Sequence, residues 1–235
     1  MSYFVTGTDT GVGKTLVSCA LLHAMAARGK RVAGFKPVAA GCDEDGQNDD
    51  AKRLRAAGNV QASYDQINPY CFHHAIAPHL AARMAGVAIE FPRILVAYQE
   101  LAAQADTVIV EGVGGFCVPL NDRQDSADLA RQLGLPVILV VGVRLGCLNH
   151  ALLTVRVIAD QQLECAGWVA NVLDADMPAL RENIAALRER IAAPLLGVVP
   201  HLAQADARAA AAQYLDLRLL KKQTTDPQIT QMSTD

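Results

Sequence analysis

The sequence predicts an α/β fold in which a single, mostly parallel sheet is covered by helices on both faces. Near-continuous apolar segments, typical of strands buried on both faces, alternate with segments of helical periodicity. The length of 235 residues suits one large α/β domain. Neither a linker nor an internal repeat interrupts the pattern, so we expect one domain over residues 1–220. Residues 221–235 are polar without apolar periodicity, and we expect a disordered tail there.

The elements follow from the order of these segments. Helical periodicity is expected after the first glycine-rich turn, over residues 50–57 and over residues 91–104, whereas residues 59–78 look irregular. The expected strands are YFVTG (3–7), RVAGFKP (31–37), TVIVEG (107–112), PVILVVG (136–142), AGWVANV (166–172) and PLLGVVP (194–200). In such sheets, ligands bind beyond the carboxyl ends of the strands.

A phosphate-binding loop is predicted between the first strand and the first helix. The stretch FVTGTDTGVGKT departs from the strict spacing G-x-x-x-x-G-K-[ST], because Thr8 stands at the first glycine position and Gly7 one residue earlier. We interpret it as a loop with one extra residue. Lys14 would then reach the β- and γ-phosphates and Thr15 would ligate Mg²⁺. The alternative is a glycine-rich turn with an exposed lysine. The motif predicts a fold of the P-loop NTPase type.

Three charged residues are further candidates, two at expected strand ends and one at an expected helix start. Glu111 follows a buried strand and could ligate Mg²⁺, or it could cap a turn. Asp50 begins a helix after an acidic loop, and could be a second ligand or a simple N-cap. Lys36 ends a strand before a proline and could neutralise a transferring phosphoryl group, or it could be a surface lysine.

Composition excludes several classes of protein. The net charge of −3 and the lack of a basic block argue against nucleic acid as a partner. The longest strongly apolar run, residues 136–143, is too short to span a bilayer, so no membrane is expected. The six cysteines lack a C-x-x-C pair, and we expect free thiols in a reducing cytoplasm. His73, His74 and His79 are interpreted as loop histidines, and Trp168 as a core residue.

The motifs together resemble dethiobiotin synthetase in order and spacing, from Tyr3 to about Leu220. They are GTDTGVGKT, GFKPVAAG, VEGVGG, VVGVRLGCLNHALLT, AGWVAN and LLGVVP. The resemblance implies a cytoplasmic, homodimeric enzyme that uses ATP as co-substrate and Mg²⁺ as cofactor. It would join CO₂ to 7,8-diaminononanoate and close a ureido ring, releasing ADP and phosphate through a carbamate and a carbamic-phosphoric anhydride.

The resemblance also implies a role for individual residues, with Lys36 as the catalytic lysine. Mg²⁺ would be held by Thr15, Asp50 and Glu111. The substrate would contact Lys36, Ala40, Gly146, Cys147, Leu148 and Asn149, the last four from the partner subunit across a shared active site. The nucleotide would be bound by Gly11, Val12, Gly13, Lys14, Thr15, Leu16, Asp50, Glu111, Gly112, Val113, Gly114, Asn171, Val172, Pro200, His201 and Leu202.

Two departures from the family pattern and two rival functions stay open. Ala40 stands where the family often has a serine, and His201 where an aromatic residue is common. Asn149 could also be an ordinary helix-start residue. A partitioning or regulatory ATPase would usually carry a second lysine early in the loop, where this chain reads TDTG. An amidoligase of the cobyrinate type would need an added glutaminase domain, for which 235 residues leave no room.

Overall fold

The central sheet consists of six strands that all run parallel. The computed structural model describes residues 1–202 and 207–220, so the predicted disordered tail lies outside the described residues. The predicted strands are confirmed, although three end earlier than expected, at Phe35, Glu111 and Val199. In spatial order the strands are β2 (Val32–Phe35), β5 (Thr107–Glu111), β1 (Tyr3–Gly7), β6 (Val137–Val143), β7 (Cys165–Val172) and β8 (Leu195–Val199).

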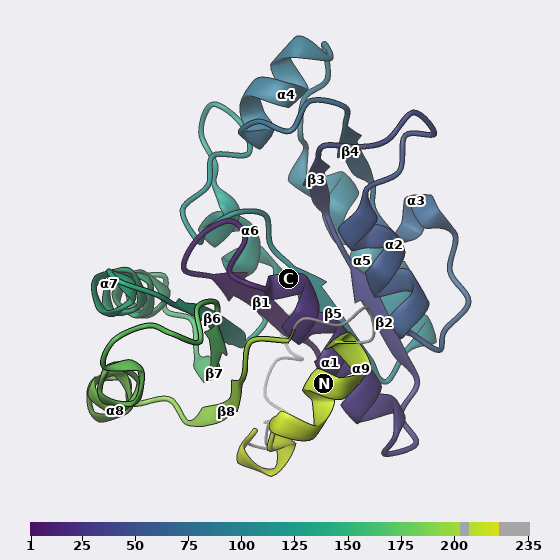
Figure 1. Cartoon of the computed structure of the whole chain (residues 1–235). Helices are drawn as coiled ribbons and strands as arrows, with labels where there is room; N and C mark the ends of the chain where they lie inside the picture. Colours follow the sequence, from purple (N-terminus) through teal and green to yellow (C-terminus); the bar gives the residue numbers. More distant parts are fainter. Residues whose placement is uncertain (203–206, 221–235) are drawn as a thin grey trace, which may run out of the picture.

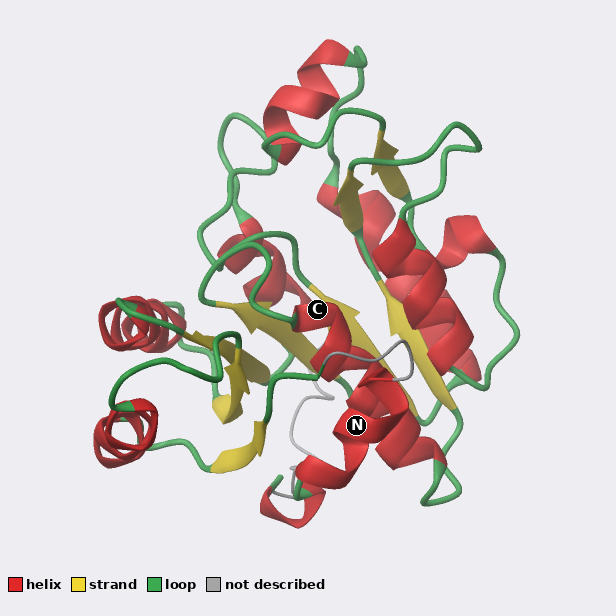
Figure 2. Cartoon of the chain, in the orientation of Figure 1, coloured by secondary structure: helices red, strands yellow, loops and turns green. Residues whose placement is uncertain are grey.

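Helices cover both faces of this sheet (Figure 2). Successive strand residues point to opposite faces, so Val5 packs with the first helix while Phe4 packs on the other side. Trp168 is fully buried among the helices of the second face, which confirms it as a core residue. One face carries α1 (Lys14–Ala26) and α9 (Ala207–Ala211); the other carries α5 (Phe91–Gln104), α6 (Ser126–Leu133), α7 (Cys147–Asp160) and α8 (Leu180–Arg190).

The strand order brings three chain segments to one point. The chain runs from β1 out to β2, returns to β5 beside β1, and then builds β6, β7 and β8 on the opposite side of β1. The direction of winding therefore reverses next to β1, and open α/β sheets bind their ligands at such a switch point. Because all six strands are parallel, the residues that follow Gly7, Phe35 and Glu111 leave the sheet at the same edge.

A small second sheet lies beyond the end of β2, and one of its two strands falls within residues 59–78, which were expected to be irregular. Strand β3 (Val38–Ala40) pairs in parallel with β4 (Tyr70–Phe72), and α3 (Tyr64–Ile67) immediately precedes β4. In Figure 1 these strands and α4 (Pro78–Met84) lie at the top of the view, above the main sheet. Three-residue strands are too short to show an alternating pattern, which explains why the sequence did not predict them.

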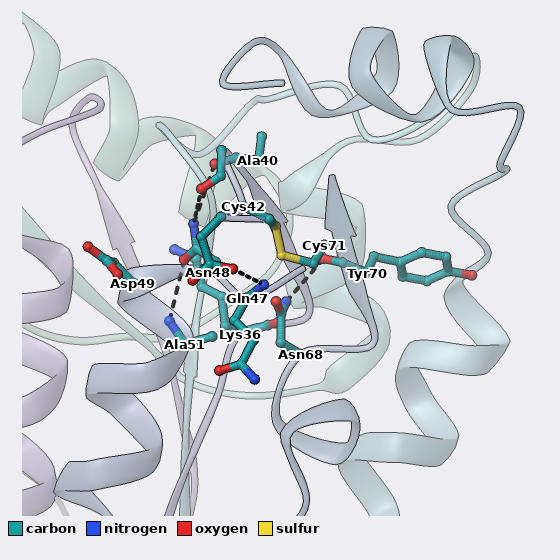
Figure 3. Close-up of a disulfide and its surroundings, with 12 residues drawn as sticks. Lys36, Ala40, Cys42, Gln47, Asn48, Asp49, Ala51, Asn68, Tyr70 and Cys71 are labelled. Atoms are coloured by element: carbon teal, nitrogen blue, oxygen red, sulfur yellow. Dashed lines mark hydrogen bonds between the residues drawn. A yellow bond between two sulfur atoms is a disulfide. The ribbon is translucent and has the colours of Figure 1, made fainter. Parts of the chain in front are cut away.

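A disulfide joins the two strands of this small sheet to each other. The bond connects Cys42 to Cys71, which are 29 residues apart in sequence, with a Cα–Cα distance of 6.2 Å (Figure 3). The expectation that all six cysteines are thiols is therefore wrong for this pair. Sequence spacing could not show it, because the two cysteines meet only when β3 and β4 pair, with Ala39 opposite Cys71. A crosslink of this span stabilises a fold by restricting its unfolded chain.

We expect the disulfide to contribute about 3–4 kcal/mol to the free energy of unfolding, because it closes a loop of this length. Reduction should then lower the melting temperature by roughly 10 °C. The measurement is thermal unfolding by circular dichroism with and without a thiol reductant. The double variant Cys42→Ser/Cys71→Ser is the control and should melt at one temperature in both buffers. A wild-type protein that is equally insensitive to reductant would contradict the prediction.

Candidate active site

The loop between β1 and α1 presents backbone N–H groups to the switch point. Gly11 and Gly13 have φ values of 75° and 92°, in the left-handed region that favours glycine. Gly13 precedes the first residue of α1, Lys14, so the turn ends where the helix begins. The helix N-terminus adds unpaired N–H groups and the positive end of its dipole. The loop therefore has the geometry of an anion-binding site, as its sequence predicted.

Asn171, at the end of β7, holds this loop through a hydrogen bond. Its buried side-chain amide donates a hydrogen bond of 2.9 Å to the carbonyl of Val12. A Cβ atom added at Gly13 would lie 2.2 Å from Asn171 Nδ2, so only glycine fits there. The structure thus joins two residues that are 159 positions apart, and it shows a contact for Asn171 that the sequence did not predict.

Lys14 is folded back against its own loop. Its ammonium group donates a hydrogen bond of 2.8 Å to the carbonyl of Asp9, and its side chain is buried. Burial, with the nearby charge of Lys36, lowers the pKa of Lys14 to about 8, against the opposing effect of Glu111 and Asp50. A phosphate anion would favour the protonated form, so the site is poised to take up a proton when an anion binds.

Lys36 forms a buried ion pair with Glu111 at the edge of the sheet. Its Nζ lies 2.6 Å from Glu111 Oε1 and donates to the Gly112 carbonyl at 3.1 Å. Glu111 is fully buried and Lys36 is 4% exposed. The alternatives of a surface lysine and of a turn-capping carboxylate are therefore wrong. The Thr15 hydroxyl donates to the same Glu111 oxygen at 2.9 Å, which ties α1, β2 and β5 together.

The carboxylate of Asp50 lies next to this ion pair. Helix α2 (Asp49–Ala57) begins one residue before the predicted start, and its N-cap is Asn48. Asp50 is therefore not the capping residue, and its carboxylate lies 3.8 Å from Lys36 Nζ. Arg53, one turn later, lies 3.7 Å from the other oxygen of Asp50. The two cations hold this carboxylate toward the phosphate loop.

The donors at this point fit a magnesium ion. Thr15, Glu111 and Asp50 supply a hydroxyl and two carboxylates, the hard oxygen ligands that Mg²⁺ prefers. Glu111 Oε2 is buried and accepts no hydrogen bond from any described residue. A buried carboxylate oxygen without a partner is costly unless a cation or water meets it. The residues present therefore match the predicted metal ligands in chemistry.

A cavity of about 1040 Å³ opens over these residues. It is bounded by the phosphate loop, by β3, by the start of α2 and by the segment that enters α4. Its volume exceeds that of a typical small-ligand site, so a nucleotide and a second small molecule fit together. Predicted site residues in its lining are Gly11, Gly13, Lys14, Thr15, Leu16, Lys36, Ala40, Asp50, Val113 and Gly114; residues that the sequence analysis missed are Thr10, Ala39, Asn48, Arg53, Ala75, Ile76, Ala77, Pro78 and Val118.

Other predicted site residues lie apart from this cavity. Val172, Pro200 and His201 line a second cavity of about 490 Å³, with residues of α8. Leu202 packs against the core beneath α1. Gly146, Cys147, Leu148 and Asn149 form the start of α7 and are not among the described residues that line the larger cavity. Nearby, Arg144 forms an ion pair of 2.5 Å with Asp9 of the phosphate loop.

The missed residues differ in how visible they are in the sequence. Asn48 stands directly before two aspartates and an apolar-periodic segment, which is a recognisable N-cap signal. Arg53 follows Asp50 by three positions, which places both on one side of a helix. The segment of Ala75 to Pro78 carries no polar side chain, so nothing in its composition points to a binding site. His73 and His74 lie in a loop, as predicted, and stack edge to face, whereas His79 lies in α4, so the prediction of a loop histidine is wrong for it. Among the described residues, no group of three or more His, Cys, Asp or Glu side chains could hold a metal ion.

Comparisons with known proteins agree with this fold. The sequence family described as AAA domain matches residues 1–209. MinD, a cell division protein of Aquifex aeolicus, superposes with a TM-score of 0.53 at 12% identity, over 89% of this chain and 86% of that one. MinD of Pyrococcus horikoshii, in complex with Mg-ADP, superposes with a TM-score of 0.51 at 17% identity, over 90% and 86%. The fold and the loop define a protein of the P-loop NTPase class.

Sequence relatives narrow this class to one family. An ATP-dependent dethiobiotin synthetase from Aromatoleum aromaticum is 58% identical over 208 residues, or 87% of this chain and 92% of that protein. The enzymes of the same description from Nitrosospira multiformis and Janthinobacterium are 56% and 53% identical, over 88% and 92% of this chain and 91% and 94% of theirs. The chain belongs to the dethiobiotin synthetase family.

Within residues 1–202 and 207–220, no helix is both long and apolar enough to cross a bilayer.

We expect ATP affinity to fall as pH rises through about 8, because the free protein then loses the proton of Lys14 that phosphate binding requires. At pH 8, binding should take up about half a proton per site. Calorimetry in two buffers of different ionisation enthalpy measures this uptake. The variant Lys14→Met should bind ATP weakly and without the proton uptake. An affinity that is constant between pH 7 and pH 9 would show that Lys14 does not contact phosphate.

Proposed function

We propose that this chain is an ATP-dependent dethiobiotin synthetase that converts 7,8-diaminononanoate, CO₂ and ATP into dethiobiotin, ADP and phosphate. The observation that carries the proposal is the convergence of Lys36, Glu111 and Asp50 in front of the phosphate loop. That arrangement faces a cavity large enough for ATP and a second substrate. The relatives that share more than half of its residues are named for this activity.

The reaction requires positioning and charge neutralisation more than covalent chemistry by the protein. One amine of the diamine takes up CO₂ to form a carbamate. A carbamate oxygen attacks the γ-phosphorus of ATP, and ADP leaves. The neighbouring amine then attacks the carbonyl carbon of the mixed anhydride, phosphate leaves, and the ureido ring closes. The oxygen transferred to phosphorus comes from CO₂, so the atoms balance without added water.

The residues of the cavity suit these steps. The backbone N–H groups of residues 11–15 and the side chain of Lys14 would hold the phosphates. Lys36 would neutralise the carbamate and the transferring phosphoryl group, both of which carry negative charge. Its burial supports this role, because a charge in a low-dielectric site acts more strongly than one in water. Gly112, Val113 and Gly114 would let the backbone pass close to the phosphates.

Thr15, Asp50 and Glu111 would hold Mg²⁺, whose charge neutralises the phosphate oxygens when ATP is bound. The unpartnered Glu111 oxygen supports this assignment. Lys36 contacts both carboxylates, so in the protein alone its single charge offsets part of their combined charge. Gly13 and Leu16 would complete the turn around the phosphates. The carbonyl of Val12 accepts a hydrogen bond from Asn171.

The adenine would lie toward the ends of β7 and β8. Asn171, Val172, Pro200, His201 and Leu202 are the residues proposed to bind it. Asn171 links this region to the phosphate loop, and the apolar second cavity begins at Val172 and Pro200. An adenine ring needs an apolar slot with a few polar groups at its edge, which these residue types provide.

The substrate would lie between two subunits of a homodimer. Lys36 and Ala40 face the cavity at the diamine end. The carboxylate end, several carbons away, would be bound by Gly146, Cys147, Leu148 and Asn149 of the partner subunit, at the start of α7. Gly146 has a φ of 90° and no side chain caps this helix start, although the N–H of Cys147 donates to the Arg144 carbonyl at 3.0 Å. Because Ala40 lacks a hydroxyl, the contact that a serine would make with the diamine is lost, replaced by water or supplied by the backbone. The proposed location is the cytoplasm, with neither membrane nor nucleic acid as a partner.

The test of the function is direct detection of dethiobiotin by mass spectrometry. We expect product only when ATP, Mg²⁺, bicarbonate and the diamine are all present, with one ADP released per product. Lys36→Met should retain ATP binding and lose turnover severely, because it removes the charge that opposes the phosphoryl group. The proposal is wrong if ATP hydrolysis proceeds equally well without the diamine and no dethiobiotin accumulates.

A mixing experiment tests the shared site. Lys36→Ala and Asn149→Ala should each be nearly inactive alone. After subunit exchange, half of the dimers are mixed, and each mixed dimer has one site with both native residues, so about a quarter of wild-type activity should return. Native mass spectrometry must confirm that mixed dimers form. If they form without recovered activity, both residues serve the same subunit's site.

A further inference from the structure

A chain of hydrogen bonds connects the start of α2 to the backbone of Lys36. The N–H of Asn48 donates to the Tyr64 hydroxyl at 2.7 Å, and that hydroxyl donates to Asn68 Oδ1 at 2.9 Å. The Asn68 amide donates in turn to the carbonyl of Lys36 at 2.6 Å and to that of Tyr70 at 3.0 Å. Figure 3 shows Asn48 and Asn68 on either side of the segment that carries Lys36. The three bridging residues lie outside the set predicted from the sequence.

Each end of this chain terminates on a residue of the proposed site. At one end, Asn48 Oδ1 accepts from the N–H of Asp50 at 3.0 Å, so the cap that starts α2 also orients the helical turn bearing the Asp50 carboxylate. At the other end, Lys36 is held through its carbonyl by Asn68 and through its N–H by Ile67, at 2.8 Å. The side chains of Lys36 and Asp50 then meet at 3.8 Å.

Asn48 also holds the wall of the cavity. Its amide group donates to the carbonyl of Gly41 at 3.2 Å, immediately after β3. Asn48 and Asn68 are 8% and 3% exposed, so their polar groups depend on these partners and not on water. Tyr64 stands at the centre, because its single hydroxyl both accepts from Asn48 and donates to Asn68.

We propose that Asn48, Tyr64 and Asn68 act as a positioning bridge that sets the separation of Lys36 and Asp50 during the reaction. The inference rests on the proposed function, because it assigns a use to that separation. Tyr64 and Asn68 are not among the described residues that line the cavity, and Asn48, which does line it, has its side-chain polar groups bonded to the backbone of Gly41 and Asp50. The three side chains act through the backbone of Lys36 and through the first turn of α2. Displacements of about 1 Å in a reacting constellation are enough to slow a positioned reaction substantially.

The variant Tyr64→Phe removes the central hydroxyl and little else. Losing a neutral hydrogen bond of this kind should lower kcat about two- to tenfold. The KM for ATP should stay unchanged, because the phosphate loop is not part of the bridge. Calorimetric titration of Mg²⁺ into the protein–ADP complex should show weaker binding, because Asp50 loses its fixed position. These readouts separate positioning from general destabilisation.

Tyr70→Phe is the matched control. Its hydroxyl also accepts a backbone N–H, that of Glu90 at 3.0 Å, but it has no link to Lys36 or Asp50 through its side chain. Both variants should lower the melting temperature to a similar extent, and Tyr70→Phe should keep the wild-type kcat. The bridge is overturned if Tyr64→Phe matches Tyr70→Phe in kcat and in Mg²⁺ affinity.

A double-mutant cycle provides a second measurement. Asn68→Asp keeps the acceptor for Tyr64 and removes the amide donor to Lys36. In the double variant with Tyr64→Phe, kcat should therefore fall by less than the product of the two single reductions in kcat. Independent, multiplicative losses would overturn the bridge. If the wild-type chain makes no dethiobiotin, the proposed function fails instead, and Mg²⁺ affinity alone then decides whether the bridge positions Asp50.

Discussion

The buried ion pair between Lys36 and Glu111 is the interaction on which the site depends. It joins the end of β2 to the end of β5, and Thr15 attaches α1 to the same carboxylate oxygen. Removing one member would leave an uncompensated buried charge, which costs about 3–5 kcal/mol. The pair therefore constrains the fold, and it consists of residues that are proposed to take part in the chemistry. Its geometry requires the strand order in which β5 lies between β2 and β1.

That strand order also explains why residues far apart in sequence share one edge. Six parallel strands direct all their carboxyl ends to one side, and the reversal of winding beside β1 leaves room for a ligand there. The small sheet of β3 and β4 then closes the cavity from above, with Ala39 and Ala40 in its wall. The main sheet thus determines where the phosphate loop lies, and the small sheet shapes the cavity next to it.

The parts predicted from sequence were those with a local signature. The strands, α5 and the phosphate loop follow from apolar runs, periodicity and glycine spacing, and the meeting of Lys36 with Glu111 follows from their positions at strand ends. Asp50 was a candidate from its place at a helix start and from the family resemblance. The Asn48–Tyr64–Asn68 bridge and the Cys42–Cys71 disulfide could not be predicted in this way. Each depends on contacts between segments that are separated in sequence. Asn48 carries a local N-cap signal, but its contact with Tyr64, like that between the two cysteines, exists only after the chain has folded.

The disulfide gives the site a particular covalent topology. The ring that it closes, from Cys42 to Cys71, contains α2, α3 and all three bridging residues, and Asp50 as well. Lys36 lies outside the ring, six residues before Cys42. A backbone cut within the exposed turn of Asp43 to Gly46 therefore opens the ring without releasing a fragment. Lys36 and Asp50 would stay on one covalent molecule after such a cut, joined through the Cys42–Cys71 disulfide.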